Sequence, residues 1–208
     1  MSNATGNEMN AKPPHAHGSA VLSLPNILTL GRIAAVPALV VCFFFEGMTA
    51  RWVALGIFIA AGVTDFFDGY LARLWSQQSA LGRMLDPIAD KLLVAVTLLM
   101  LAAVGTIYGI HIWAAVVILS REVLVSGLRE FLAELRVSVP VTELAKWKTT
   151  IQLVAIGILI AGPAADEVFA WTSFIGLTGL WVAAILTLYT GYDYLKSGLD
   201  YLMEDDGR

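Results

Sequence analysis

The sequence predicts an all-α integral membrane protein with six transmembrane helices. Hydrophobic residues make up 58% of the 208-residue chain and charged residues only 14%, whereas a soluble domain carries roughly 25% charged residues. Apolar runs of about 20 residues, the length that spans a bilayer, also recur along the chain. The net charge of −4 argues against a nucleic-acid partner, which favours a basic surface.

Six segments are long and apolar enough to span a membrane: 25–45, 51–74, 81–105, 110–135, 142–161 and 167–196. In the first, Ser23 is a candidate N-cap and Pro25 lies in the first turn. Residues 1–20 are polar and contain Pro13-Pro14, so we expect a flexible tail before a single domain at 21–200. Residues 201–208 form an acidic tail.

The short connections predict antiparallel neighbours, so both termini and the even-numbered loops share one side of the membrane. That side collects most basic residues: Lys12, Arg32, Arg73, Arg83, Arg129, Arg136, Lys146, Lys148, Lys196 and Arg208. The opposite side carries Arg51 with three acids. The positive-inside rule therefore places both termini in the cytoplasm, and the charge at that end predicts a polar cavity open to the cytoplasm.

Four carboxylates lie in the second and third segments. Asp65 and Asp68 are three residues apart, and Asp86 and Asp90 are four apart, so on helices each pair shares one face. Small residues lie on the same faces: Gly69, Ala72 and Gly82. Packed antiparallel, the two helices would direct all four acids into one space. The small residues would leave room for a bulky ligand to approach the backbone beside it.

Such a cluster would repel itself unless a cation neutralised it. Mg²⁺ takes a few carboxylates together with substrate phosphate oxygens, and two ions would form a phosphoryl-transfer clamp. Mn²⁺ has the same preference for oxygen. Two alternatives remain open: salt bridges to Arg73, Arg83 and Lys91, and a divalent-cation-binding or transporting bundle. A transporter would be expected to place its acids near the midplane rather than near one face.

The pattern Asp65-x2-Asp68-Gly69-x2-Ala72-Arg73-x8-Gly82-x3-Asp86-x3-Asp90 resembles the signature of the CDP-alcohol phosphatidyltransferases at all eight fixed positions. The resemblance implies that an alcohol attacks a CDP-activated lipid, forming a phosphodiester lipid and releasing CMP. It implies that Asp65, Asp68 and Asp86 bind metal, with Asp90 as both ligand and general base.

The resemblance also implies a binding site for CDP-diacylglycerol, a homodimer and a place in the bacterial inner (cytoplasmic) membrane. The donor-binding positions it implies are Gly69, Ala72, Arg73, Ser79, Gly82, Asn26, Thr29 and Arg32. For Asn26 and Thr29, local bonding to the helix backbone is an equally simple interpretation.

The acceptor alcohol must be selected outside this signature. Arg121 and Arg129 share a stripe of the fourth segment, and Lys146 and Lys148 open the fifth. Cations that face a group of acids suggest a second anionic ligand such as a phosphorylated alcohol, although a fringe contacting lipid headgroups is the alternative.

Two stretches resemble the phosphatidylglycerophosphate synthases within that family. One is Arg121-Glu122 through Leu128-Arg129-Glu130, and the other is 145–152, where Ala145 replaces the usual glycine. This resemblance implies sn-glycerol 3-phosphate as acceptor, its phosphate held by some of Arg121, Arg129, Lys146 and Lys148. An enzyme that forms phosphatidylinositol phosphate or cardiolipin remains the alternative within the family.

Overall fold

The computed structural model describes residues 24–75, 80–135 and 143–205, and this part of the chain is helical with no strand. The elements are α1 (Leu24–Phe43), α2 (Met48–Trp75), α3 (Ala80–Ala103), the short 3₁₀ helix η1 (Gly109–His111), α4 (Ile112–Glu134), α5 (Glu143–Ala165) and α6 (Thr172–Asp205). The all-α prediction is confirmed. The expected tail at 1–20 lies outside the described residues.

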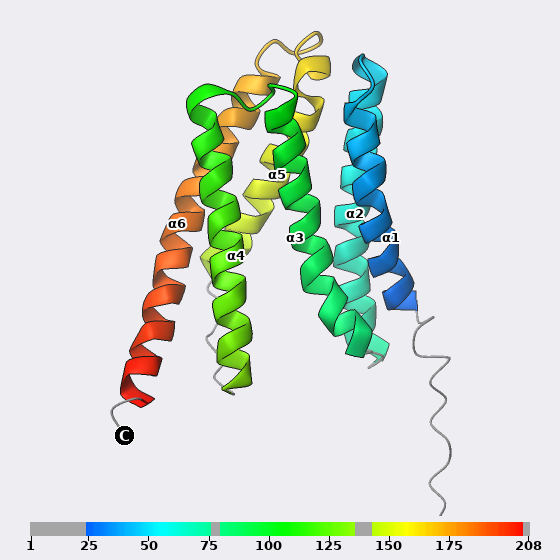
Figure 1. Ribbon diagram of the computed structural model, residues 1–208. Coiled ribbons are helices and arrows are strands. Elements are labelled where there is room, and N and C mark those ends of the chain that lie inside the picture. Colours follow the sequence, from blue (N-terminus) through cyan, green and yellow to red (C-terminus); the bar gives the residue numbers. More distant parts are fainter. Residues whose placement is uncertain (1–23, 76–79, 136–142, 206–208) are drawn as a thin grey trace, which may run out of the picture.

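The six long helices run alternately up and down (Figure 1). The start of α1 and the ends of α2, α4 and α6 lie at one end of the bundle, which we call the charged end. The connections α1–α2, α3–α4 and α5–α6 lie at the opposite, far end. The two described chain ends therefore lie at the same end, as the sequence predicts for antiparallel neighbours.

The helices form two groups of three. Helix α1 packs on α2 and α3, α6 packs on α5 and α4, and α2 packs on α5 to join the groups. The core where they meet is apolar and includes Leu39, Phe58, Leu98, Ile118, Leu159 and Leu180. Large apolar side chains such as Leu99 and Val123 remain exposed on the outside, as expected of helices that face lipid.

Five parts of the described chain are long and apolar enough to cross a membrane: Asn26–Phe43, Met48–Asp65, Gly109–Glu134, Leu144–Ala165 and Thr172–Lys196. Helix α3 is of similar length, but Asp86, Asp90 and Lys91 lie in its first half. The chain is thus a multi-pass membrane protein by length and composition, and the sixth span stays a prediction.

The last two helices differ from their predicted bounds. Helix α5 continues through Pro163 to Ala165 instead of ending at 161. Helix α6 begins at Thr172 instead of 167, because the Asp166 carboxylate accepts the Ser173 N–H and keeps Val168 and Phe169 exposed in the connection. It then continues past 196 to Asp205. In this added length, Gly198 packs closely on Leu128 and Leu132 of α4.

The far-end connections are tight. Gly47 joins α1 to α2 with φ 112°, and Gly105 follows α3 with φ 73°. Side chains disfavour this left-handed region, so glycine suits both positions. These short turns keep consecutive helices adjacent and fix which helix ends meet at the charged end.

Candidate functional site

Three of the four acids predicted to form the site have described side chains, and α1 contacts two of them. Arg32 forms an ion pair with Asp65 of α2. The Thr29 hydroxyl donates a hydrogen bond to Asp86 Oδ1 of α3 at 2.5 Å. Asp90, one turn further along α3, is exposed. Helix α1 therefore ties the acids of α2 and α3 to one place at the charged end.

The polar residues of α1 are buried although they lie at its end. Asn26, Thr29 and Arg32 recur every three residues and are 2%, 1% and 2% exposed. This spacing keeps them on one face, which turns toward α2 and α3. A buried arginine requires an opposite charge, and Asp65 supplies it. Their role in donor binding stays a prediction, and Thr29 reaches across to Asp86 of α3, beyond its own helix backbone.

Several predicted site residues are only partly described. The side chains of Asp68, Gly69, Ala72, Arg73 and Arg83 and all of Ser79 lie outside the described residues. Gly82 is buried at the start of α3. In the described part of the chain, no three acidic, histidine or cysteine residues lie close enough together to hold a metal ion.

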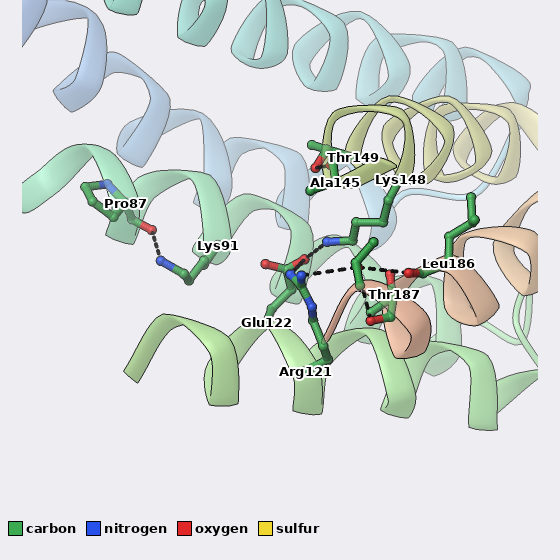
Figure 2. Close-up of polar contacts among 10 residues, drawn as sticks. Pro87, Lys91, Arg121, Glu122, Ala145, Lys148, Thr149, Leu186 and Thr187 are labelled. Carbon is green, nitrogen blue, oxygen red and sulfur yellow. Dashed lines mark hydrogen bonds and ion pairs between the residues drawn. The ribbon is translucent and has the colours of Figure 1, made fainter. Parts of the chain in front are cut away.

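The alternative that salt bridges neutralise the acids is tested only at Lys91. Its Nζ donates to the Pro87 carbonyl oxygen of its own helix at 3.1 Å, and the described residues offer it no ion pair (Figure 2). Among the described residues, Lys91 therefore forms no direct ion pair with Asp86 or Asp90.

A second polar cluster joins α4, α5 and α6 (Figure 2). Lys148 of α5 is 3% exposed and forms an ion pair with Glu122 of α4. Arg121 Nη1 lies 3.7 Å from a Glu122 oxygen, and Arg121 Nη2 donates to the Thr190 hydroxyl of α6 at 3.3 Å. One carboxylate thus holds two cations that lie 27 residues apart in the sequence.

A cavity of about 150 Å³ lies between α3 and α4 beside this cluster. Its lining residues are Pro87, Lys91, Arg121, Glu122, Val125, Ser126, Arg129 and Glu130. Three cations and two acids therefore surround one small space. On α3, the lining residues Pro87 and Lys91 directly follow Asp86 and Asp90, so the cavity adjoins the acidic group.

The four cations expected to bind the acceptor are thus not equivalent. Arg121 and Lys148 meet through Glu122, and Arg129 lines the cavity with its guanidinium 5.7 Å from the Tyr194 ring. Lys146 is exposed and does not line the cavity.

Sequence reasoning assigned no site role to three residues of this region. Lys91 was considered only as a partner for the acids, and Glu122 only as part of a motif. Thr190 lies in an apolar run of α6 with no pattern around it. The adjacent Arg121-Glu122 charges within a membrane helix were a signal for Glu122. Nothing in the sequence indicated Thr190.

Comparisons with known proteins show which family this chain resembles. A family model described as CDP-alcohol phosphatidyltransferase matches residues 22–189. A CDP-diacylglycerol–glycerol-3-phosphate 3-phosphatidyltransferase from Rickettsia bellii (strain RML369-C) is 45% identical over 179 residues, covering 86% of this chain and 97% of the relative.

Two further relatives carry the same description. That of Cereibacter sphaeroides is 41% identical over 217 residues, covering 88% of this chain and 98% of the relative. That of Salmonella choleraesuis (strain SC-B67) is 39% identical over 184 residues, covering 88% and 98%. The similarity therefore extends over almost the whole length of each relative.

Proposed function

The chain belongs to the CDP-alcohol phosphatidyltransferase family, and on that premise we propose that it is a phosphatidylglycerophosphate synthase. It transfers the phosphatidyl group of CDP-diacylglycerol to the primary hydroxyl of sn-glycerol 3-phosphate. The hydroxyl oxygen forms a bond to the phosphorus that bears diacylglycerol, the bond from that phosphorus to CMP breaks, and CMP leaves with the electron pair.

The observation that carries this proposal is the position of the cation-lined cavity next to the acids. Lys91, Arg121 and Arg129 line a space of about 150 Å³, a volume suited to a small phosphorylated alcohol and too small for a second lipid. A free phosphate monoester carries up to two negative charges, and guanidinium groups bind it through paired N–H donors. This cavity favours glycerol 3-phosphate over a lipid acceptor.

We propose that Asp65, Asp68, Asp86 and Asp90 hold divalent cations, two Mg²⁺ or Mn²⁺ ions. Carboxylate oxygens are the donors that such ions prefer. When bound, the cations neutralise charge that develops on the diphosphate. Asp65 and Asp86 are already turned toward the same part of α1 by Arg32 and Thr29, which supports a shared site.

Asp90 is the proposed general base. Its side chain is exposed, and it directly precedes the cavity residue Lys91 on α3. A carboxylate within reach of the acceptor hydroxyl takes its proton as the new bond forms. Gly69 and Arg73 are the proposed contacts of the CDP group, together with Ala72, Gly82, Ser79, Asn26, Thr29 and Arg32.

Glu122 has a supporting role in this proposal. The Lys148 ammonium is almost completely buried, and a buried charge is costly without a partner. Glu122 supplies that partner and at the same time lies beside Arg121. It therefore offsets the charge of Lys148 and holds Arg121, which lines the cavity.

We also propose that all six helices span the membrane, with the charged end in the cytoplasm of a bacterial cell, at its inner membrane. The clustering of basic residues at that end supports this orientation. A homodimer is proposed from the family resemblance alone.

The proposal is tested with detergent-purified protein, CDP-diacylglycerol and Mg²⁺, measuring CMP release. We expect release with sn-glycerol 3-phosphate, little with inositol phosphate or phosphatidylglycerol, and a phosphatidylglycerophosphate product by mass spectrometry. EDTA should abolish release, and Mg²⁺ or Mn²⁺ should restore it. Equal rates with the three alcohols would refute the acceptor, and full activity in EDTA would refute the metal requirement.

A further inference from the structure

Arg121 of α4 is held by α6, a helix that carries none of the residues expected in the site. Arg121 Nη2 donates to the Thr190 hydroxyl at 3.3 Å across a sequence separation of 69 residues. Its side chain is only 15% exposed. A long arginine side chain has many rotamers in water, so a single buried position requires contacts that exclude the others.

The hydroxyl of Thr190 is itself fixed. It donates to the Leu186 carbonyl oxygen of α6 at 2.9 Å. Its hydrogen is therefore directed along its own helix, and its oxygen is left as an acceptor for Arg121. Thr190 is a rigid acceptor for the guanidinium and not a freely rotating hydroxyl.

Gly191 leaves space for the aliphatic part of the Arg121 side chain to pack against α6. A Cβ atom built on Gly191 would lie 2.9 Å from Arg121 Cγ and 3.3 Å from Arg121 Nε. These separations are shorter than ordinary contacts, so any side chain at 191 must displace Arg121. Glycine weakens a helix interior relative to alanine, and the close approach of Arg121 accounts for its presence there.

One donor of the Arg121 guanidinium has no partner among the described residues. Arg121 Nη2 is bound to Thr190 and Nη1 lies near Glu122, but Nε is buried with no hydrogen-bond partner among the described residues. Buried donors are normally paired. Arg121 also lines the cavity between α3 and α4, so its side chain borders both α6 and the space where an anionic ligand would lie.

From these contacts we infer that Thr190 and Gly191 are positioning residues, which set the Arg121 guanidinium for the phosphate of the acceptor. The inference rests on the proposed function, because it assigns a purpose to Arg121 in that reaction. Thr190 fixes the guanidinium from one side, and Gly191 lets the aliphatic stem lie flat against α6. Neither residue contacts substrate in this scheme.

The test compares Michaelis constants for the two substrates. Gly191→Ala and Thr190→Val should each raise the KM for glycerol 3-phosphate ~10-fold, as expected when a charged hydrogen bond or its geometry is lost. The KM for CDP-diacylglycerol should change less than ~2-fold. Thr190→Ser keeps the hydroxyl and should restore most of the affinity for glycerol 3-phosphate.

Gly198→Ala is the matched control, since it adds the same methyl group to α6 against α4. A Cβ there would lie 3.1 Å from a Leu128 methyl carbon and 3.3 Å from one of Leu132, which are apolar neighbours. If the effect of Gly191→Ala came only from crowding between α4 and α6, Gly198→Ala would share it. We expect Gly198→Ala to leave the ratio of the two KM values unchanged.

Arg121→Ala separates failure of the inference from failure of the proposed function. No CMP release by the unmodified protein with glycerol 3-phosphate would refute the function. Release that depends on Arg121, together with an unchanged KM in both Thr190→Val and Gly191→Ala, would overturn the inference alone. Thermal unfolding in detergent shows whether Gly191→Ala folds, and Thr190→Val, which is nearly isosteric, decides the question if it does not.

Discussion

The two ends of the bundle use polar residues in opposite ways. At the far end, Arg51 Nη1 donates to the Thr106 hydroxyl at 3.3 Å, and its guanidinium lies 5.1 Å from the Phe43 ring. Trp181 Nε1 donates to His111 Nδ1 at 3.0 Å. In these contacts Arg51 and Trp181 have neutral partners, and each contact joins segments that form or flank a connection.

At the charged end, two contacts join charges of opposite sign on different helices. Arg32 pairs with Asp65, and Lys148 pairs with Glu122. Ion pairs of this kind lose as much in desolvation as they gain in attraction, so they are poor devices for stability alone. The desolvation free energy of these ion pairs is explained if they hold charged groups in position for a ligand. The comparison predicts that substitutions at the charged end change activity, whereas those at the far end leave activity unchanged and affect stability alone.

The largest effect is expected for Asp90→Asn. The amide cannot take the proton of the acceptor hydroxyl, so CMP release should fall by ~10²–10⁴-fold, the usual contribution of a general base. The thermal midpoint in detergent should not fall, since Asp90 is exposed and the substitution removes a negative charge from an acidic group. Rate and thermal unfolding are measured on the same preparation.

Asp166→Asn is the matched control at the far end, being the same chemical change outside the spans. It should release CMP at the unmodified rate. Substantial activity in Asp90→Asn, or an equal loss in both variants, would contradict the division between the two ends.

A smaller effect, on both stability and activity, is expected for Glu122→Gln. The substitution leaves the buried Lys148 without an opposite charge, at a cost of about 2–3 kcal/mol after allowance for the partial exposure of Glu122. The KM for glycerol 3-phosphate should rise ~10-fold because Arg121 and Lys148 lose their common anchor. Thermal unfolding and initial rates measure the two changes.

The sign of the KM change is informative. If Glu122 acted only as a negative charge near the acceptor phosphate, its removal would lower the KM. The double variant Glu122→Gln with Lys148→Met removes the unpaired charge and should recover stability without recovering affinity. A lowered KM in Glu122→Gln would show that Glu122 opposes acceptor binding.

The difference between the two ends also explains what the sequence could predict. The long apolar runs made the helices and their order predictable, because span length and periodicity are local properties. The acids of α2 and α3 were predictable as a group for the same reason, since their spacing is fixed within each helix. Asp65 and Asp86 were expected to lie near each other, and their contacts with Arg32 and Thr29 place both beside α1.

Contacts between distant helices were not predictable from one sequence. Arg121 and Thr190 lie 69 residues apart, and no periodicity specifies which faces of α4 and α6 meet. The start of α6 was misplaced for a related reason. Val168 and Phe169 are as apolar as a span, but Asp166, which accepts the Ser173 N–H, holds the connection outside the helix. The hydrogen bond from the Ser173 N–H to Asp166 sets the start of α6, although the residues before it are apolar enough for a span.

The smallest expected effect is that of Asp166→Asn on stability, and it tests the far end directly. The hydroxyl and backbone N–H of Ser173 hold the pKa of Asp166 below its ordinary value, so the ionised side chain stabilises the first turn of α6. This contribution is complete above the unfolded pKa, about 3.9, and is lost as the pH falls through the lower folded value. Asp166→Asn should therefore lower the thermal midpoint slightly at pH 7, and the difference from the unmodified protein should disappear in acid. A difference that persists below the folded pKa would show that Asp166 acts through its shape and not its charge.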